Sequence, residues 1–376
     1  MRPVSRHLLF GTAIVGAMSI SLLALVLYSR QPKALPVSPT SVTPGAVVTP
    51  TPTRERDTVQ PPSPSPSATS TATAVSTIGP LTGLPAEDPA NQRALAVMID
   101  NIDGAGLQPG LAQADVVVEG LVEGGITRLM AIFQSRPAAA VEPVRSVRVP
   151  FVQWADAFDA VIAHVGMAEE PGPADVRVAL RELRVDDIDY EGSNAAEAAF
   201  RRDPQRFAPH NVITSTDALR EVMAARKLRA AAPRPLWQFH RATAPGASAL
   251  SVNIDFGVGS FEDSWKWDEA SATYARSQYF APHLDGTTRK QLTAANVIVV
   301  FAPAYVADGV GHVLYEFEGS GRILVFSGGT AIEGTWKRPS STSTFSFTDA
   351  NGQLLALNAG QTWIELVDHT GSATYR

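Results

Sequence analysis

Cysteine is absent from the 376 residues of the chain, and this absence excludes several kinds of structure. Disulfide bonds, thiolate metal sites and a catalytic thiol all require Cys. Lipid attachment at a lipoprotein processing site requires it as well, so that route of anchoring is excluded. The fold must therefore be held together by its apolar core, and a chain of this length can build one.

Several signatures of enzymes and of nucleic-acid binding are also missing. The chain has no Gly-x-Ser-x-Gly, no P-loop, no dinucleotide-binding fingerprint and no His-Glu-x-x-His motif. The first 78 residues hold six Lys or Arg and two Asp or Glu, which leaves 25 basic and 35 acidic residues, a net charge of −10, for the rest. Nucleic-acid binders usually carry a basic stripe, and none occurs here. We therefore expect no nucleic-acid partner, no metal site and no cofactor.

The longest apolar run, residues 8–28, predicts a transmembrane helix. It contains no charged residue, and Arg30 and Lys33 follow it. About 20 apolar residues cross a bilayer as a helix. A cleaved signal peptide is the alternative, but its apolar core is roughly 7 to 15 residues and ends in an Ala-x-Ala-like site, which residues 25–30 lack. We predict that residues 1–30 are a single-pass anchor in the cell membrane, with the C-terminal part extracytoplasmic.

Residues 31–78 have the composition of a disordered linker. This segment of 48 residues holds 10 Pro, 10 Thr and 7 Ser, with only five charged residues. Such a composition buries too little apolar surface to offset the entropy of ordering the chain. We therefore predict a spacer that separates a folded part from the membrane.

Residues 79–235 are predicted to form an α/β (α+β) domain. Apolar strand-like runs alternate here with segments of helical period, and that mixture is typical of layered α/β domains. The expected strands are 94–99, 115–121 and 126–134. The expected helices run from Phe151 to Val165, from Asn194 to Arg202, and from a cap at Thr214 through Met223.

Residues 236–376 are predicted to form a mostly antiparallel β domain. Strict alternation of apolar and polar residues and turns rich in Gly, Asn and Asp indicate strands rather than helices. The expected strands are 251–256, 272–279, 296–301, 312–317, 323–326, 343–347 and 362–367.

A set of short motifs along residues 79–367 resembles one known family. The motifs are Pro80-Leu81-Thr82-Gly83, Val97-Met98-Ile99-Asp100-Asn101, residues 108–115, residues 122–128, residues 143–148, Pro209-His210-Asn211 and Gly334-Thr335-Trp336. Together they are similar to the YerB-like family, domain of unknown function 3048, with its N-terminal and C-terminal portions. Many members are described as lipoproteins, and this chain departs from them by lacking Cys. The resemblance implies fold and location but no chemistry.

The candidate ligand-binding residues are charged side chains near the expected strand ends. They are Arg145, Arg148, Arg128, Asp100, Asp115, Glu123 and His164. Arg145 and Arg148 precede a helix expected to begin near Pro150, and a helix N-terminus with paired guanidiniums suits a phosphate or carboxylate. The alternative is that the arginines, with Glu119 and the other acidic neighbours, form internal ion pairs. No catalytic residue can be named.

A shorter segment is similar to the core of LytR–CpsA–Psr phosphotransferases. In that pattern an Asp begins one strand and Pro-Arg-Asp follows another. Asp115 and Arg145 match, but Ser146 stands where the second Asp belongs. The resemblance would imply binding of a pyrophosphate-linked glycan, and the departure puts catalysis in doubt.

The remaining histidines and the tryptophans are expected to be structural. His210 and His283 lack metal-ligand spacing, so hydrogen-bonded positions at domain edges are favoured. Trp265, Trp267, Trp336 and Trp363 could line a carbohydrate surface, but aromatic residues in strands more often belong to the core.

The sequence predicts a membrane-anchored envelope protein that binds an anionic or glycan envelope ligand, or a protein partner. The alternative is a LytR–CpsA–Psr-like phosphotransferase or hydrolase that acts on a pyrophosphate-linked envelope polymer. The geometry of the carboxylates around Arg145 should discriminate between the two classes of function.

Overall fold

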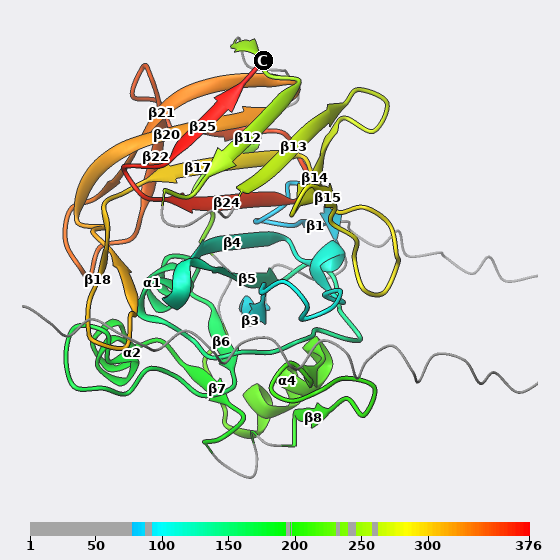
Figure 1. Ribbon diagram of the computed structural model, residues 1–376, viewed down its shortest axis with the longest axis vertical. Helices are drawn as coiled ribbons and strands as arrows, with labels where there is room; N and C mark the ends of the chain where they lie inside the picture. The colour runs from blue at the N-terminus through cyan, green and yellow to red at the C-terminus, as the bar shows by residue number, and fades with distance from the viewer. Residues whose placement is uncertain are drawn as a thin grey trace, which may run out of the picture. The chain divides into compact units, whose positions relative to one another are not determined.

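The computed structural model describes residues 77–86, 92–192, 196, 198–230, 234–239, 246–257 and 262–376. The predicted membrane span, residues 8–28, and all but the last two residues of the predicted linker lie outside these ranges. Within them, no helix is long and apolar enough to cross a membrane. The described part is mostly β-structure with few helices (Figure 1), which agrees with the mostly β character predicted for residues 236–376.

The largest sheet is mixed and has 11 strands. In spatial order its strands are β11 (Ala247–Ser248), β21 (Thr330–Arg338), β20 (Gly319–Ser327), β17 (Asn296–Phe301), β24 (Thr362–Val367), β4 (Val116–Leu121), β5 (Thr127–Phe133), β3 (Leu95–Asp100), β6 (Val161–His164) and β7 (Asp187–Asp189), with β22 (Ser346–Asp349) paired to β21. The expected strands 94–99, 115–121, 126–134, 296–301 and 362–367 are all among them, so these predictions are confirmed.

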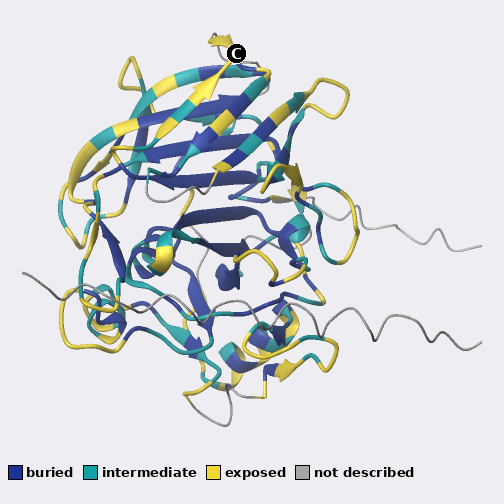
Figure 2. Cartoon of the chain, in the orientation of Figure 1, coloured by how far each residue is buried: buried dark blue, intermediate teal, exposed yellow. Residues whose placement is uncertain are grey.

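Strand β24 joins the two halves of the sequence in this sheet. It runs parallel to β17 on one side and parallel to β4 on the other, with Glu365 opposite Val299 and Glu119. Figure 1 shows β17, β24 and β4 side by side, and Figure 2 shows that β24 and β4 are buried along their length. One sheet therefore carries strands from both predicted domains, 79–235 and 236–376.

A second, antiparallel sheet has six strands. It contains β15 (Ala281–Pro282), β14 (Thr273–Gln278), β13 (Glu262–Asp268), β12 (Ser251–Asp255), β25 (Ser372–Tyr375) and β16 (Thr293–Ala294). It packs on the large sheet through aromatic contacts. Trp265 on β13 meets Trp363 on β24 with ring centroids 5.3 Å apart, and Tyr274 meets Phe326 at 6.5 Å.

The helices and the short strand pairs complete the described part. The helices are α1 (Val149–Ala157), α2 (Val176–Leu183) and α4 (Thr216–Ala225), with the 3-10 turns η2 (Leu111–Gln113) and η3 (Glu123–Gly125). The two-stranded pairs are β1 (Thr77–Ile78) with β2 (Pro85–Ala86), β8 (Phe200–Arg202) with β9 (Val212–Thr214), β10 (Gln238–Phe239) with β23 (Ala356–Leu357), and β18 (Ala304–Val306) with β19 (Val313–Tyr315). Trp154 of α1 stacks on Phe345, with centroids 4.4 Å apart, so α1 packs against aromatic residues from the second half of the chain.

The helix predicted from Phe151 to Val165 is too long. Helix α1 ends at Ala157, and Asp159 adopts a φ of 53°, which helices do not allow. Residues 161–164 then form β6, which is buried on both faces and parallel to β3. Apolar positions at steps of three and four arise by chance when a helix is followed closely by a fully buried strand.

Two further helix predictions need correction. The segment expected to be helical up to Arg202 has β8 at Phe200–Arg202, paired with β9, while residues 193–195 and 197 lie outside the described part. Helix α4 was predicted, but its N-cap is Ser215 rather than Thr214. The Ser215 side chain accepts a hydrogen bond from the backbone N–H of Ala218.

Candidate functional site

Asp100, at the end of β3, lies at the centre of an ionic cluster. Its side chain is 2% exposed, and its Oδ2 is 3.1 Å from Arg145 Nε and 2.5 Å from His210 Nδ1. Backbone hydrogen bonds from Asp100 to Pro143 and from Arg145 to Met98 hold the segment that carries Arg145 against β3. The structure thus brings together Asp100 and Arg145, two of the predicted site residues.

Glu123 organises a second cluster, in the turn between β4 and β5. Arg148 donates to it from Nε and Nη2, at 2.9 and 2.6 Å, and Arg128 Nη2 lies 3.4 Å from its Oε1. Burial raises the pKa of Glu123, but the hydrogen bonds from Arg148 and the charge of Arg128 outweigh it and hold this pKa at about 2. Burial and the charge of Arg148 lower the pKa of Arg128 to about 10.

The three predicted arginines therefore fall into two groups. Arg128 is 3% exposed and also donates from Nη1 to the carbonyl oxygen of Ser146, at 2.8 Å. Together with Arg148 it neutralises Glu123, which is the ion-pairing arrangement that the sequence left open as the alternative. Arg145 differs, because its side chain is 25% exposed.

An open pocket of about 530 Å³ lies beside Arg145. Its charged lining consists of two guanidiniums and three carboxylates, contributed by Arg145, Arg202, Glu169, Glu170 and Glu191. Arg202 donates from Nη1 to the side-chain oxygen of Asn211 at 2.8 Å, and its guanidinium lies 5.7 Å from the centre of the Tyr190 ring. Arg128 and Arg148 do not line this pocket, so its positive charge comes from Arg145 and from Arg202, a residue that the sequence did not single out.

Asp115 lies apart from Arg145, whereas His164 directly precedes Val165, whose backbone N–H donates to the carbonyl oxygen of Arg145 at 3.1 Å. Asp115 precedes β4, at the end of the sheet opposite Arg128, and accepts hydrogen bonds from the backbone N–H groups of Gln134 and Ser135. Burial raises its pKa. His164 is fully buried in β6, with Nδ1 3.0 Å from the carbonyl oxygen of Gly166. Both side chains have structural partners, and their role in binding stays a prediction.

A buried ionic network lies between the two sheets. Arg276 of β14 is fully buried and donates from Nη2 to Glu119 Oε2 at 2.5 Å and to Asp263. Its guanidinium also lies 4.6 Å from the centre of the Trp363 ring. Glu365, on β24 next to Glu119, is buried there too. Burial raises the pKa of Asp263 and of Glu365 well above the usual range, and neighbouring carboxylates add to the effect.

Sequence reasoning missed most of this network. Of its members only Glu119 was considered. A signal existed in β14, where Tyr274, Arg276 and Gln278 alternate with more exposed residues and so share one buried face. A charged residue on the buried face of a strand needs a partner, because unpaired charge is costly to bury.

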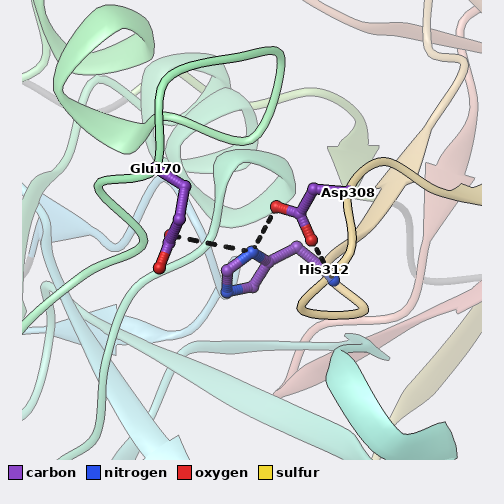
Figure 3. A group of neighbouring side chains, drawn as sticks. All are labelled: Glu170, Asp308 and His312. Atoms are coloured by element: carbon purple, nitrogen blue, oxygen red, sulfur yellow. Dashed lines mark hydrogen bonds and ion pairs between the residues drawn. The ribbon is translucent and has the colours of Figure 1, made fainter.

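Two groups among the described residues bring metal-ligand atoms within 4.8 Å of one another. In the first, His312 Nδ1 lies 2.6 Å from Asp308 Oδ2 and 4.0 Å from Glu170 Oε2, and Figure 3 shows the Glu170 carboxylate facing the imidazole across the gap between two loops. The hydrogen bond from His312 holds the pKa of Asp308 at about 2, and a cation would have to displace that hydrogen. The second group is the buried set Glu119, Asp263 and Glu365.

The other expectations for His and Trp side chains can be compared with the structure. Trp265, Trp336 and Trp363 are 1%, 2% and 0% exposed, which confirms that they belong to the core. His210 and His283 have hydrogen-bond partners, since His210 contacts Asp100 and His283 Nε2 lies 2.9 Å from Gln108 Oε1.

Comparison with known proteins identifies similar chains for nearly all of the described part. Two family models match: "Protein of unknown function (DUF3048) N-terminal domain" over residues 81–229, and "Protein of unknown function (DUF3048) C-terminal domain" over residues 252–364. The chain is 31% identical over 306 residues to a Bacillus subtilis (strain 168) protein named "Putative lipoprotein YerB", covering 78% of this chain and 87% of the relative. A crystal structure of YerB protein from Bacillus subtilis superposes with a TM-score of 0.68 and 29% identity, covering 78% of this chain and 98% of that one.

Proposed function

We propose that this chain, which belongs to the DUF3048 family of YerB-like proteins, is a membrane-anchored envelope protein whose pocket beside Arg145 binds an envelope ligand. The observation that carries the proposal is the exposure of Arg145. Its neighbours Arg128 and Arg148 are occupied by Glu123, whereas Arg145 lines an open pocket together with Arg202. A guanidinium that stays accessible to solvent beside a cavity can hold an anionic group of a ligand.

The charges around the pocket restrict what this ligand can be. Glu169, Glu170 and Glu191 line the same pocket as the two arginines, so a ligand of purely negative charge would meet repulsion. A ligand that carries both a carboxylate and an ammonium group satisfies both signs. We therefore propose a peptide of the envelope, with an anionic group at Arg145 and Arg202 and an amine at the glutamates.

The buried Asp100 positions Arg145 for this role. Asp100 Oδ2 contacts both Arg145 Nε and His210 Nδ1, so the contact with Arg145 uses Nε and leaves the terminal nitrogens of the guanidinium for other partners. The Arg145 Nη1 group donates to the carbonyl oxygen of Pro209 at 3.3 Å, which orients the side chain along the pocket wall. A held side chain loses less entropy on binding than a mobile one.

The phosphotransferase alternative gains no support from this geometry. Its match required Asp115 and Arg145 to act together, but Asp115 accepts hydrogen bonds from Gln134 and Ser135 at the other end of the sheet. The carboxylate nearest Arg145 is Asp100, and its buried side chain holds the arginine in place.

The location proposed for the chain rests on its first residues. The relative from Bacillus subtilis is named as a lipoprotein, whereas this sequence contains no Cys to carry a lipid. The apolar run at residues 8–28 would supply the membrane attachment instead, with the family domains on the extracytoplasmic side. The Pro- and Thr-rich residues 31–78 would separate these domains from the bilayer.

Isothermal titration of the full chain in nanodiscs tests the binding proposal. The probe is the synthetic pentapeptide L-Ala-γ-D-Glu-L-Lys-D-Ala-D-Ala, compared with a form acetylated on both amines and amidated on both carboxyl groups, and with inorganic pyrophosphate. We expect the free pentapeptide to bind best, and Arg145→Ala or Arg202→Ala to weaken binding at least tenfold, about 1.4 kcal/mol.

The control is Arg322→Ala, which removes an exposed arginine paired with Glu333 at a distance from the pocket. It should bind the pentapeptide as the wild type does. Wild-type protein that binds neither the pentapeptide nor pyrophosphate would overturn the proposal. Preference for pyrophosphate would instead restore a purely anionic ligand.

A further inference from the structure

The turn between β14 and β15 places two aromatic residues in a sterically unfavourable conformation. Gln278 pairs with Ala281, which leaves Tyr279 and Phe280 as a two-residue hairpin loop. Their φ angles are 50° and 61°. Positive φ at both central positions is the pattern of a type I′ turn, where Asn-Gly is favoured because a Cβ atom crowds the backbone.

Burial explains these aromatic residues only in part. Phe280 is 98% exposed and removes little apolar surface from water, whereas Tyr279 is 40% exposed and its hydroxyl donates to the carbonyl oxygen of Asn101 at 3.2 Å. An unfavourable conformation that the surrounding fold maintains is found most often at binding and active sites. The position of the turn therefore raises the question of what lies beside it.

A pocket of about 530 Å³ opens next to this turn, distinct from the one at Arg145. Residues 102–104 and 106–108 line it on one side and residues 278, 279 and 281–284 on the other, so Tyr279 lines the pocket and Phe280 does not. Its deepest polar side chains are Gln108, Gln278 and His283, which are 5%, 8% and 7% exposed. Asp103 and the Tyr279 ring also line it, so the pocket combines an aromatic surface with polar groups.

Hydrogen bonds to the buried ionic network hold these polar side chains in place. Arg276 Nη1 donates to Gln278 Oε1 at 2.7 Å and also to His283 Nδ1. His283 Nε2 then donates to Gln108 Oε1 at 2.9 Å, and Gln278 Nε2 donates to Asn101 Oδ1 at 3.0 Å. Arg276 is itself held by ion pairs with Glu119 and Asp263. These ion pairs therefore keep the side chains of Gln278 and His283 in one orientation in the pocket.

The chemistry of the lining excludes a strongly charged ligand. Among the described residues that line this pocket there is no Lys or Arg. Arg276 is fully buried and does not line the pocket, although it contacts the lining residues Gln278 and His283. Burial and the charge of Arg276 lower the pKa of His283 well below its usual range, so the imidazole is neutral. Amides, a neutral imidazole and one carboxylate exchange hydrogen bonds with hydroxyl groups, and an aromatic face accepts the apolar C–H face of a ring.

We propose that this pocket binds an uncharged sugar ring of an envelope glycan, with the Tyr279 ring as the stacking surface. The hydroxyl groups of the sugar would meet Gln108, Gln278 and Asp103 in the pocket. This site goes beyond the peptide pocket at Arg145, and neither proposal depends on the other.

Titration of the full chain in nanodiscs with chitotetraose, and in parallel with maltotetraose, tests the proposal. We expect saturable binding of at least one of these uncharged tetrasaccharides. Tyr279→Ala should weaken it at least tenfold, whereas Tyr279→Phe should retain it because the phenyl ring offers the same flat face. Phe207→Ala is the matched control, since Phe207 is 89% exposed in a different loop and its removal should leave binding unchanged.

The double substitution Tyr279→Asn with Phe280→Gly separates a role in binding from a role in folding. Asn-Gly suits a type I′ turn, so the melting temperature should rise, by about 3 °C, while binding of the tetrasaccharide is lost. A saturating concentration of the free pentapeptide should leave binding of the tetrasaccharide unchanged, which keeps this result independent of the peptide pocket. Binding of neither tetrasaccharide, or equal binding by wild type and Tyr279→Ala, would overturn the proposal.

Discussion

Arg148 holds Glu123 through two parallel hydrogen bonds, Nε to Oε2 at 2.9 Å and Nη2 to Oε1 at 2.6 Å. Arg148 is the N-cap residue of α1, and Glu123 lies in the turn that joins β4 to β5. The pair therefore joins the start of helix α1 to the turn between β4 and β5 in the large sheet. Bidentate pairs of this kind are stronger and more directional than single ion pairs.

Glu123 should make the protein less stable in acid. Its pKa is about 2 in the folded state against 4.5 normally, so its stabilising effect is present above pH 4.5 and is lost as the pH falls toward 2. The loss should be about 2 kcal/mol, allowing for its partly exposed side chain. Urea unfolding at pH 7, 4.5 and 3 should show a smaller decline for Glu123→Gln. Glu333→Gln, in an exposed ion pair, is the control and should follow the wild type.

Glu142 should have the opposite effect. Burial raises its pKa to about 7, although Arg206 Nε lies 3.2 Å away and opposes the shift. Because the folded state binds the proton more tightly than the unfolded chain, stability falls as the pH rises from 4.5 through 7. Between pH 5 and pH 8, Glu142→Gln should gain about 3 kcal/mol relative to the wild type, measured by urea unfolding. Equal slopes with pH for the two proteins would contradict this.

Two carboxylates of the buried network should respond differently to amide substitution. Burial raises the pKa of Glu365 well above its usual range, so it is protonated in the folded state and Gln imitates it. Glu365→Gln should therefore change the free energy of unfolding by less than about 1 kcal/mol. Glu119 accepts from Arg276, Asn101 and Thr127, and Glu119→Gln should cost about 3 kcal/mol because it leaves the buried Arg276 short of a partner. Thermal unfolding of the two variants measures the difference.

Trp336 should be essential to the core rather than to ligand binding. It is 2% exposed, and its Nε1 donates to the carbonyl oxygen of Phe301 at 2.9 Å. Trp336→Ala should cost about 3 to 5 kcal/mol in the free energy of unfolding. Gly321→Ala should also destabilise the fold, because an added Cβ would lie 2.4 Å from Trp336 Nε1. Trp267→Ala, which alters a partly buried indole, should cost clearly less, and a cost below about 1 kcal/mol for Trp336→Ala would contradict a role in the core.

The strands of the central sheet were predictable because their local signal matches their final environment. Asn296–Phe301 and Thr362–Val367 have the same bounds in the sequence prediction and in the structure. Runs of Val, Ile and Leu that are buried on both faces favour strands whatever their neighbours are. Helix α1 shows the limit of this reasoning. The helix ends before Asp159, and the residues that follow pair with β3 as strand β6. The spacing of apolar residues between 151 and 165 does not show where the helix ends and the strand begins.

The candidate site was predictable only in part. Asp100 and Arg145 were both identified, and the structure joins them because the segment before Arg145 continues the hydrogen bonding of β3. Glu123 decides which arginine remains accessible, because it pairs with Arg128 and Arg148 and not with Arg145. The position of Glu123 depends on the packing of the turn after β4 against the start of α1, which the sequence does not show. Arg202 entered the pocket through the pairing of β8 with β9, in a segment that had been predicted to be helical.

The sequence alone determined the absence of cysteine chemistry, the apolar run at residues 8–28, the change in composition over residues 31–78 and the mostly β character of residues 236–376. Each of these depends on composition or on neighbouring residues, which the linear order contains. Only the tertiary structure placed β24 between β17 and β4, and so brought Glu119 against Arg276, 157 residues further along the chain. Strand order and the meeting of distant charges arise from burial of the whole core, and no local pattern specifies them.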